Sequence, residues 1–120
     1  MTMISKSIIL LFATYVSTVL CDNTVYYCTD INWGGSCHQS PPVDGSCHNM
    51  QGGVAQYNDQ ISSFGPDPNL YCIIFRDLDC KFTTGGYTSV GYPGVADLRT
   101  IGFNDAISSY TCGPLGTTPG

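Results

Sequence analysis

A duplicated hexapeptide restricts the folds open to this chain more than any other feature of its sequence. Asn-Asp-Gln-Ile-Ser-Ser occupies residues 58–63 and Asn-Asp-Ala-Ile-Ser-Ser occupies residues 104–109, so five of the six letters recur. Each copy is followed by an aromatic residue, Phe64 or Tyr110. The repeat indicates two equivalent supersecondary units that bury their faces against each other. We therefore expect one domain built from two packed motifs.

The hydrophobic pattern around the repeat is that of short strands. Long stretches with a helical period are missing, whereas β-rich runs bounded by Gly, Pro, Asn and Asp are frequent. The sequence predicts eight strands, at residues 24–29, 36–39, 53–57, 61–65, 70–76, 80–84, 88–92 and 107–112, with a helical turn or bend at 93–98. This spacing predicts an all-β fold in which two Greek-key motifs form a sandwich. Motif 1 covers about residues 24–65 and motif 2 about residues 70–112.

The first 21 residues are expected to be a secretory signal peptide rather than part of the fold. Lys6 precedes an apolar stretch that is too short to span a membrane, and small residues near Cys21 suit cleavage after that position. The protein is then secreted and extracellular, with its domain at residues 22–112 and a flexible tail at 113–120.

Six cysteines remain after this cleavage, and in a small exported chain they predict three disulfides. Cys72 and Cys112 are expected to pair, because they lie on neighbouring strands of an antiparallel Greek key. The pairing of the other four cysteines stays open: Cys28, Cys37, Cys47 and Cys80. Two of these precede histidines, as zinc ligands can, but cysteines in an oxidising compartment favour disulfides.

The charge balance excludes several function classes. Without Lys6, nine aspartates and three cations give a net charge of −6. The lack of a basic patch argues against nucleic acid and against charge-driven binding to anionic membranes, and no stable membrane insertion is expected. No Gly-x-Ser-x-Gly elbow occurs, and nothing singles out a pair of catalytic carboxylates. The sequence thus predicts a protein that is not an enzyme, and a monomer.

Each hexapeptide carries the hard oxygen ligands that calcium prefers. The aspartate supplies a carboxylate, the next residue a backbone carbonyl and the first serine a hydroxyl, while Ile61 or Ile107 points into the core. One copy has fewer than the six to eight ligands that calcium takes, whereas two copies together, with another carbonyl and water, reach that number. The alternative is that Asn-Asp only forms a turn and Ser-Ser only caps a strand.

The chain resembles the βγ-crystallin family, including its small secreted killer-toxin-like proteins. The family motif pairs a hairpin of the form Tyr/Phe/Trp-x-x-x-x-Tyr/Phe-x-Gly with a later Asn/Asp-Asn/Asp-x-x-Ser/Thr-Ser calcium signature. Both hexapeptides fit the signature at every fixed position. The hairpin of motif 1 fits in part, with Trp33 as the second aromatic residue and Gly35 as the glycine, whereas motif 2 places Thr83 where glycine is expected.

The resemblance implies up to two calcium sites, each clamped by both motifs. Ligands of the first would be the Gln60 carbonyl, the Ser62 hydroxyl, the Asp105 carboxylate and a carbonyl near Thr29. Ligands of the second would be the Ala106 carbonyl, the Ser108 hydroxyl, the Asp59 carboxylate and a carbonyl near Asp77. Asn58 and Asn104 are expected to brace the two turns. Calcium would mainly reinforce the fold.

A second function class stays open from the sequence. Small disulfide-linked proteins of this kind also act as antimicrobial or killer-toxin-like proteins, or as effectors directed at a host surface. The acidic charge argues against lysis of anionic membranes but leaves a protein or glycan target possible.

Overall fold

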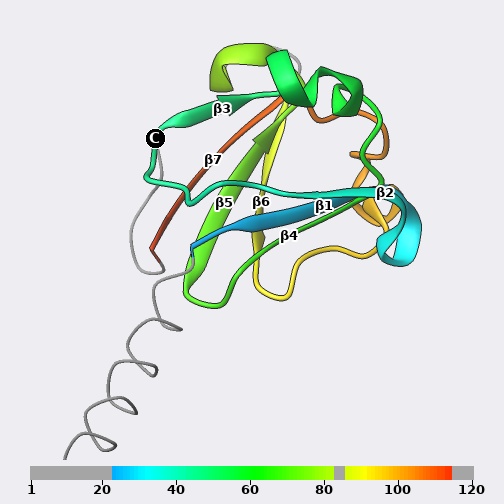
Figure 1. Ribbon diagram of the computed structural model, residues 1–120, viewed down its shortest axis with the longest axis horizontal. Helices are drawn as coiled ribbons and strands as arrows, with labels where there is room; N and C mark the ends of the chain where they lie inside the picture. Colours follow the sequence, from blue (N-terminus) through cyan, green and yellow to red (C-terminus); the bar gives the residue numbers. More distant parts are fainter. Residues whose placement is uncertain (1–22, 83–85, 115–120) are drawn as a thin grey trace, which may run out of the picture.

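Two antiparallel sheets packed face to face make up the residues that the computed structural model describes, 23–82 and 86–114 (Figure 1). The strands and short 3₁₀ helices are, in chain order, β1 (Val25–Asp30), η1 (Ile31–Trp33), β2 (Gly34–Gln39), β3 (Cys47–Asn49), η2 (Gly52–Tyr57), β4 (Ser63–Pro66), β5 (Leu70–Phe75), η3 (Leu78–Cys80), β6 (Tyr87–Gly91), η4 (Leu98–Ile101) and β7 (Ser109–Pro114). The first sheet has the order β2-β1-β4 and the second has the order β3-β7-β5-β6. The fold is thus all-β with two Greek-key motifs, as predicted.

Each motif lends a segment to the sheet of the other. β3 precedes β4 in motif 1, yet it pairs with β7 of motif 2 in the second sheet. In return, Val95 of motif 2 forms a bridge with Phe64 of β4 in the first sheet. Neither sheet is therefore complete without residues from both motifs.

The core lies between the two sheets and is rich in aromatic rings. Tyr27 of β1 stacks almost parallel to Phe64 of β4, with ring centroids 6.1 Å apart, and Tyr110 of β7 meets Phe64 edge-on at 5.4 Å. Ile61 and Ile107, one from each hexapeptide, are fully buried. Burial of a large apolar side chain stabilises a fold by about 1.5–3 kcal/mol, so these rings and isoleucines hold the two motifs together.

The six cysteines among the described residues are joined in three disulfides. Cys72–Cys112 links opposed residues of β5 and β7, which confirms the pairing expected from the sequence. Cys28–Cys37 links opposed residues of β1 and β2. Cys47–Cys80 ties β3 to η3 and is the disulfide that joins motif 1 to motif 2.

Some predicted elements differ from the structure. Residues 53–57, predicted as a strand, belong to the 3₁₀ helix η2. The residues of this segment that pack against the core, Val54 and Tyr57, are three positions apart, which is the period of a 3₁₀ helix and not of a strand. The predicted strand at 80–84 begins within η3, and residues 83–85 lie outside the described part of the chain. β3 was not predicted, since three residues without an apolar pattern carry no strand signal.

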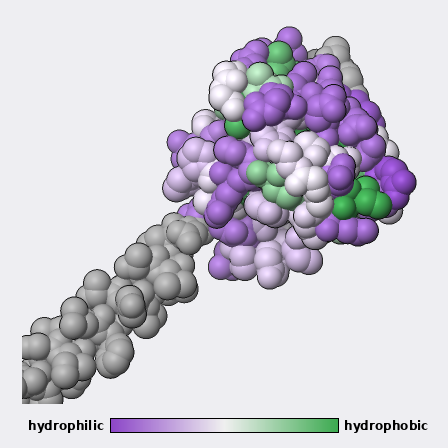
Figure 2. All heavy atoms as spheres, turned by 45° about the vertical axis from the view of Figure 1, so that its right-hand side comes forward, coloured by the Kyte–Doolittle hydropathy of each residue, from purple (hydrophilic) through white to green (hydrophobic). Residues whose placement is uncertain are grey.

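The predicted signal peptide and residues 115–120 of the predicted tail lie outside the described residues, while Gly113 and Pro114 are part of β7. Among the described helices, none has the length and apolar character needed to cross a membrane. Figure 2 shows a largely hydrophilic face with small, separate hydrophobic areas.

Candidate metal-binding site

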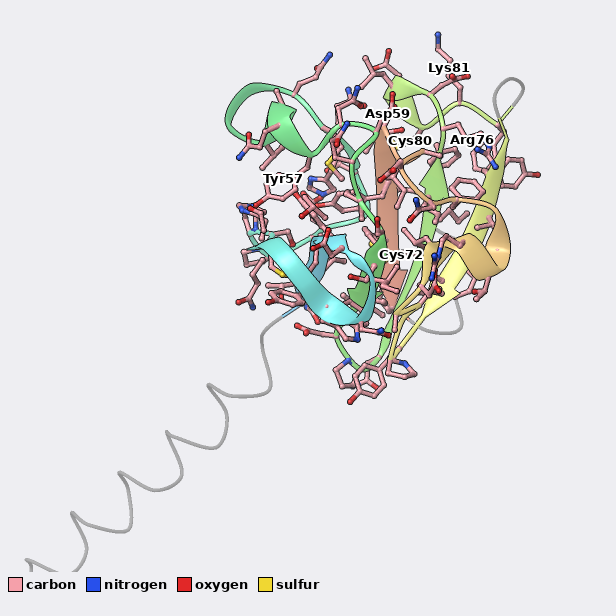
Figure 3. All side chains as sticks on the ribbon, turned by 90° about the vertical axis from the view of Figure 1, so that its right-hand side faces the viewer. Tyr57, Asp59, Cys72, Arg76, Cys80 and Lys81 are labelled. Atoms are coloured by element: carbon pink, nitrogen blue, oxygen red, sulfur yellow. A yellow bond between two sulfur atoms is a disulfide. The ribbon has the colours of Figure 1, made fainter. Side chains whose placement is uncertain are left out.

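The two hexapeptides lie side by side and exchange backbone hydrogen bonds. The Asp59 amide donates to the Ile107 carbonyl at 3.1 Å, and the Asp105 amide donates to the Ile61 carbonyl at 2.9 Å. In Figure 1 the turns that follow η2 and η4 gather on the right of the molecule, and Figure 3 looks onto this side, where Asp59 is labelled. The repeat thus brings its two copies together around an approximate twofold axis.

Both aspartates adopt the left-handed backbone conformation, with φ of 56° at Asp59 and 55° at Asp105. Aspartate tolerates this region better than most residues because its short side chain bonds locally. The shared φ bends the chain sharply after each Asn-Asp pair. It leaves both carboxylates exposed at the surface while the isoleucine two residues later enters the core.

Each carboxylate reaches across to the serine of the opposite motif. The Ser108 hydroxyl donates to Oδ1 of Asp59 at 3.0 Å, and the Ser62 hydroxyl donates to Oδ1 of Asp105 at 3.4 Å. Both serines are buried, at 5% and 6% exposure respectively. A carboxylate and a hydroxyl from different motifs are thus adjacent at two equivalent places.

The second serine of each copy fastens the hexapeptide to the hairpin of its own motif. The Ser63 hydroxyl donates to the Asp30 carbonyl at 3.0 Å, and the Ser109 hydroxyl donates to the Asp77 carbonyl. One position earlier, the Ser62 amide donates to the Cys28 carbonyl at 2.9 Å. Main-chain carbonyls of each hairpin turn therefore lie beside each candidate site.

Equivalent positions in the turns of the two hairpins are 47 residues apart in the sequence. Asn32 and Asp79 occupy the same left-handed position within η1 and η3, with φ of 57° and 67°. This register makes Phe82, one residue before Thr83, the counterpart of Gly35. It also makes Arg76 the counterpart of Thr29. Sequence reasoning missed Arg76, although aligning Asp30 with Asp77 in the two turns would have identified it.

Two buried side-chain oxygens at these turns have no hydrogen-bond partner among the described residues. They are Oδ1 of Asn58 and Oδ1 of Asn104, the first residue of each hexapeptide. A buried polar atom without a partner costs roughly 1–3 kcal/mol, so its occurrence at both equivalent positions is a feature of the site rather than an isolated defect. The two oxygens add to the hard-oxygen character of this part of the surface.

A guanidinium group makes the surroundings of the two places unequal. The Arg76 side chain lies over the ring of Phe103 at 4.3 Å and donates to the Gly102 carbonyl, just before the second hexapeptide. Arg99 is engaged elsewhere, because it pairs with Asp97 at 2.8 Å and holds the pKa of that carboxyl below its usual range. Thr29, at the position equivalent to Arg76, is neutral and accepts from the Ser36 amide.

The donor set suits a hard cation that accepts neutral oxygens. No cluster of three or more His, Cys, Asp or Glu side chains occurs within residues 23–82 and 86–114. Zinc and other metals that prefer nitrogen or sulfur depend on such clusters. Calcium takes carbonyl, hydroxyl and water oxygens beside a carboxylate, and the hexapeptides combine the first two with Asp59 or Asp105.

Comparison with known proteins identifies the fold. No family model matches the sequence, and no curated protein matches it. A solved structure from work on the evolution of the eye lens βγ-crystallin domain fold is 24% identical, with a TM-score of 0.63 over 78% of this chain and 88% of the other. A βγ-crystallin domain from Flavobacterium johnsoniae is 23% identical, with a TM-score of 0.59 over 78% and 98% of the two chains. Spherulin 3A from Physarum polycephalum is 26% identical, with a TM-score of 0.55 over 79% and 86%. The chain therefore has the βγ-crystallin fold that its hexapeptides indicated.

Proposed function

We propose that this chain is a secreted, non-enzymatic protein that binds calcium at its paired hexapeptides, and that calcium reinforces its fold. The observation that carries the proposal is the reciprocal contact between Asp59 and Ser108 and between Asp105 and Ser62. A turn needs no contact of this kind with its copy in the other motif. A shared cation site does need it, because neither motif alone has enough oxygens.

The two sites would draw on the same kinds of ligand. In the first, the Asp105 carboxylate and the Ser62 hydroxyl are joined by the main-chain carbonyls of Gln60 and Thr29. In the second, Asp59 and Ser108 are joined by the carbonyl of Ala106 and a hairpin carbonyl near Asp77, for which the register of the turns favours Arg76. Water would complete each shell.

Affinity should be modest because each site has one carboxylate. Calcium modules of extracellular proteins bind with Kd values of about 10⁻⁴–10⁻³ M, and we expect these sites near the tighter end or up to about tenfold tighter. At a calcium concentration ten times the Kd, each filled site stabilises the fold by about 1.4 kcal/mol. Calcium would thus supplement the three disulfides, each worth roughly 2–4 kcal/mol.

The disulfides also support a location outside the cell. Three disulfides in so small a domain are typical of proteins that mature in an oxidising compartment. Together with the signal peptide expected at residues 1–21, they favour secretion.

The test is calorimetric titration of the oxidised, chelator-treated protein with calcium, combined with thermal unfolding in calcium and in EGTA. Two ions per chain and a melting temperature raised by calcium are the expected results. Absence of binding heat and of any thermal shift would reject the proposal and leave the hexapeptides as turns that start strands.

Single substitutions assign the ligands. Asp59→Asn and Asp105→Asn keep the size of the side chain but remove its charge, so each should abolish one of the two sites and spare the other. The matched control is Asp44→Asn, an exposed aspartate near Gly45 at the far end of β7, which should retain both sites. If both clamp variants bind two ions like the unsubstituted protein, the assignment is wrong.

A further inference from the structure

A second surface feature lies on the outer side of the first sheet. It is an open groove of about 320 Å³ lined by Tyr26, Trp33, Pro66, Asp67, Tyr92 and Pro93. Its three aromatic side chains are 43%, 36% and 59% exposed for Tyr26, Trp33 and Tyr92 respectively. Tyr27 is buried in the core, whereas its neighbour Tyr26 points to the outer face of β1.

The groove is held rigid by its backbone. The Asn32 amide donates to the Ala96 carbonyl at 2.7 Å, which ties the turn bearing Trp33 to the loop bearing Tyr92. Below them, Gly65 and Gly94 are in such close contact that a Cβ on either would overlap the other strand, and the Trp33 ring lies over Gly65. The aromatic side chains thus project from a fixed floor rather than from mobile loops.

The rings present flat apolar faces together with polar tips. Tyr26 and Trp33 have centroids 6.1 Å apart and ring planes tilted by 31°, and with Tyr92 they make up the aromatic platform of the groove. Aromatic side chains in a rigid position offer a large contact area at little cost in conformational entropy. A ligand that stacks on them needs a flat apolar face of its own.

A carboxylate at the edge of the platform restricts the ligand further. Oδ2 of Asp67 accepts hydrogen bonds from the Thr24 amide at 2.9 Å and from the Thr24 hydroxyl at 3.0 Å, so the carboxylate is fixed in place. Because a carboxylate only accepts hydrogen bonds, it favours ligands rich in hydroxyl donors and repels carbonyl oxygens and anions. The negative net charge of the whole chain acts in the same direction.

From this combination we propose that the groove binds a neutral polysaccharide. The C–H face of a pyranose ring stacks on an aromatic ring, and its hydroxyl groups donate to a carboxylate such as Asp67. A proline-rich peptide also stacks on aromatic grooves, but it brings carbonyl acceptors and few donors to Asp67. The inference is independent of the calcium proposal, since no residue of the groove is among the proposed ligands.

The experiment is a sedimentation assay in which the oxidised protein is mixed with particles of β-glucan, chitin or cellulose and its depletion from solution is measured. We expect saturable depletion by at least one of the three, and the three arms identify which sugar polymer is bound. Trp33→Ala and Tyr92→Ala should each weaken binding about tenfold, as the loss of a central aromatic contact does in other interfaces. Tyr92→Phe keeps the ring and should retain most of the binding.

Tyr87→Ala is the matched control, because Tyr87 is 51% exposed but lies outside the groove, against Phe82. It should bind as well as the unsubstituted protein, and thermal unfolding will establish that each variant is folded. The proposal is overturned if none of the particles depletes the protein. It is equally overturned if the groove variants bind like the Tyr87 variant, or if a proline-rich peptide binds the groove while the polysaccharides do not.

Discussion

The hairpin of motif 1 is fixed by a disulfide between its own two strands, whereas the hairpin of motif 2 is fixed by a disulfide to the other motif. Cys28–Cys37 joins opposed residues of β1 and β2, and Gly35, with φ of 76°, completes the turn. In motif 2 the equivalent turn is tied by Cys80 to β3 of the other motif, and Phe82 stands at the glycine position. The same fold is therefore reached by a local closure in one half and by a contact between halves in the other.

The two candidate calcium sites differ in the same way, because each borders one of these hairpins. The first is bordered by Thr29 in a self-contained hairpin, while the second is bordered by Arg76, whose charge lies over Phe103. A repeated signature thus does not make two identical sites. The repeat keeps the same geometry at both candidate sites, whereas the hairpins give the two sites different neighbouring charges.

We expect the largest effect from removing either of the two disulfides that lie within a single motif. Cys72–Cys112 closes a loop with a sequence separation of 40, against 9 for Cys28–Cys37. By the chain-entropy relation, replacing the first pair with alanine should lower the free energy of unfolding by about 4 kcal/mol and replacing the second by about 3 kcal/mol. Denaturant unfolding of both double variants checks the order, and a larger loss for Cys28–Cys37 would contradict the dependence on loop length.

Alkaline pH should weaken the aromatic core that both motifs share. Burial raises the pKa of Tyr110 to about 12, and it also raises the pKa of Tyr27. The folded protein then keeps protons that the unfolded chain releases, so stability is complete below about pH 10 and falls by roughly 2 kcal/mol through Tyr110 as the pH rises to about 12, with a further loss through Tyr27.

Urea unfolding at a series of pH values measures this loss. Tyr110→Phe should reduce it and leave the contribution of Tyr27, whereas the exposed Tyr87→Phe should not change it. An alkaline loss of the same size in the Tyr110 variant would contradict the assignment.

Gly35→Ala should destabilise motif 1 by about 1–2 kcal/mol, because a Cβ at positive φ is disfavoured and would overlap the hydroxyl of Thr29. Gly53→Ala is the matched control, since a Cβ there meets no atom within 4 Å. Thermal unfolding of the two variants checks the difference. Equal stabilities would show that the hairpin relaxes around the added methyl group.

The smallest expected effect concerns the charge at the second clamp. Arg76→Gln should tighten calcium binding at that site about twofold, the size of a screened surface interaction, and leave the first site unchanged. Arg76→Lys keeps the charge and serves as the control. Calorimetric titration in low salt resolves the change, and tightening by both substitutions would exclude charge as its cause.

The sequence predicted the parts of this fold that repeat. The hexapeptides, with the isoleucine that each sends into the core, identified two motifs and the contact between them. β3 could not be predicted, because Cys-His-Asn has no apolar pattern and becomes a strand only through β7 and Cys80. The second hairpin lacks the glycine of the first, so its register was predicted one residue too late, at Thr83 instead of Phe82, and Arg76 was not recognised as the counterpart of Thr29.

The exposed aromatic groove is another feature that the sequence could not predict. Composition counts Trp33 and Tyr92 as hydrophobic residues and therefore as candidates for the core. Whether such a ring is buried depends on which segments, distant in the sequence, pack around it. Here the contact between Gly65 and Gly94 brings Trp33 and Tyr92 together at the surface. Short-range patterns carry no information about that contact.

The placement of Cys47–Cys80 has a consequence for proteolysis. The exposed residues Pro68 and Asn69 form the link between the motifs, where a protease would cut first. A cut there would yield two polypeptides that remain covalently joined and keep their exchanged strands, so the nicked molecule should migrate as one species until a reductant is added. A protein built in this way can keep its two halves together after its backbone is cut between the motifs.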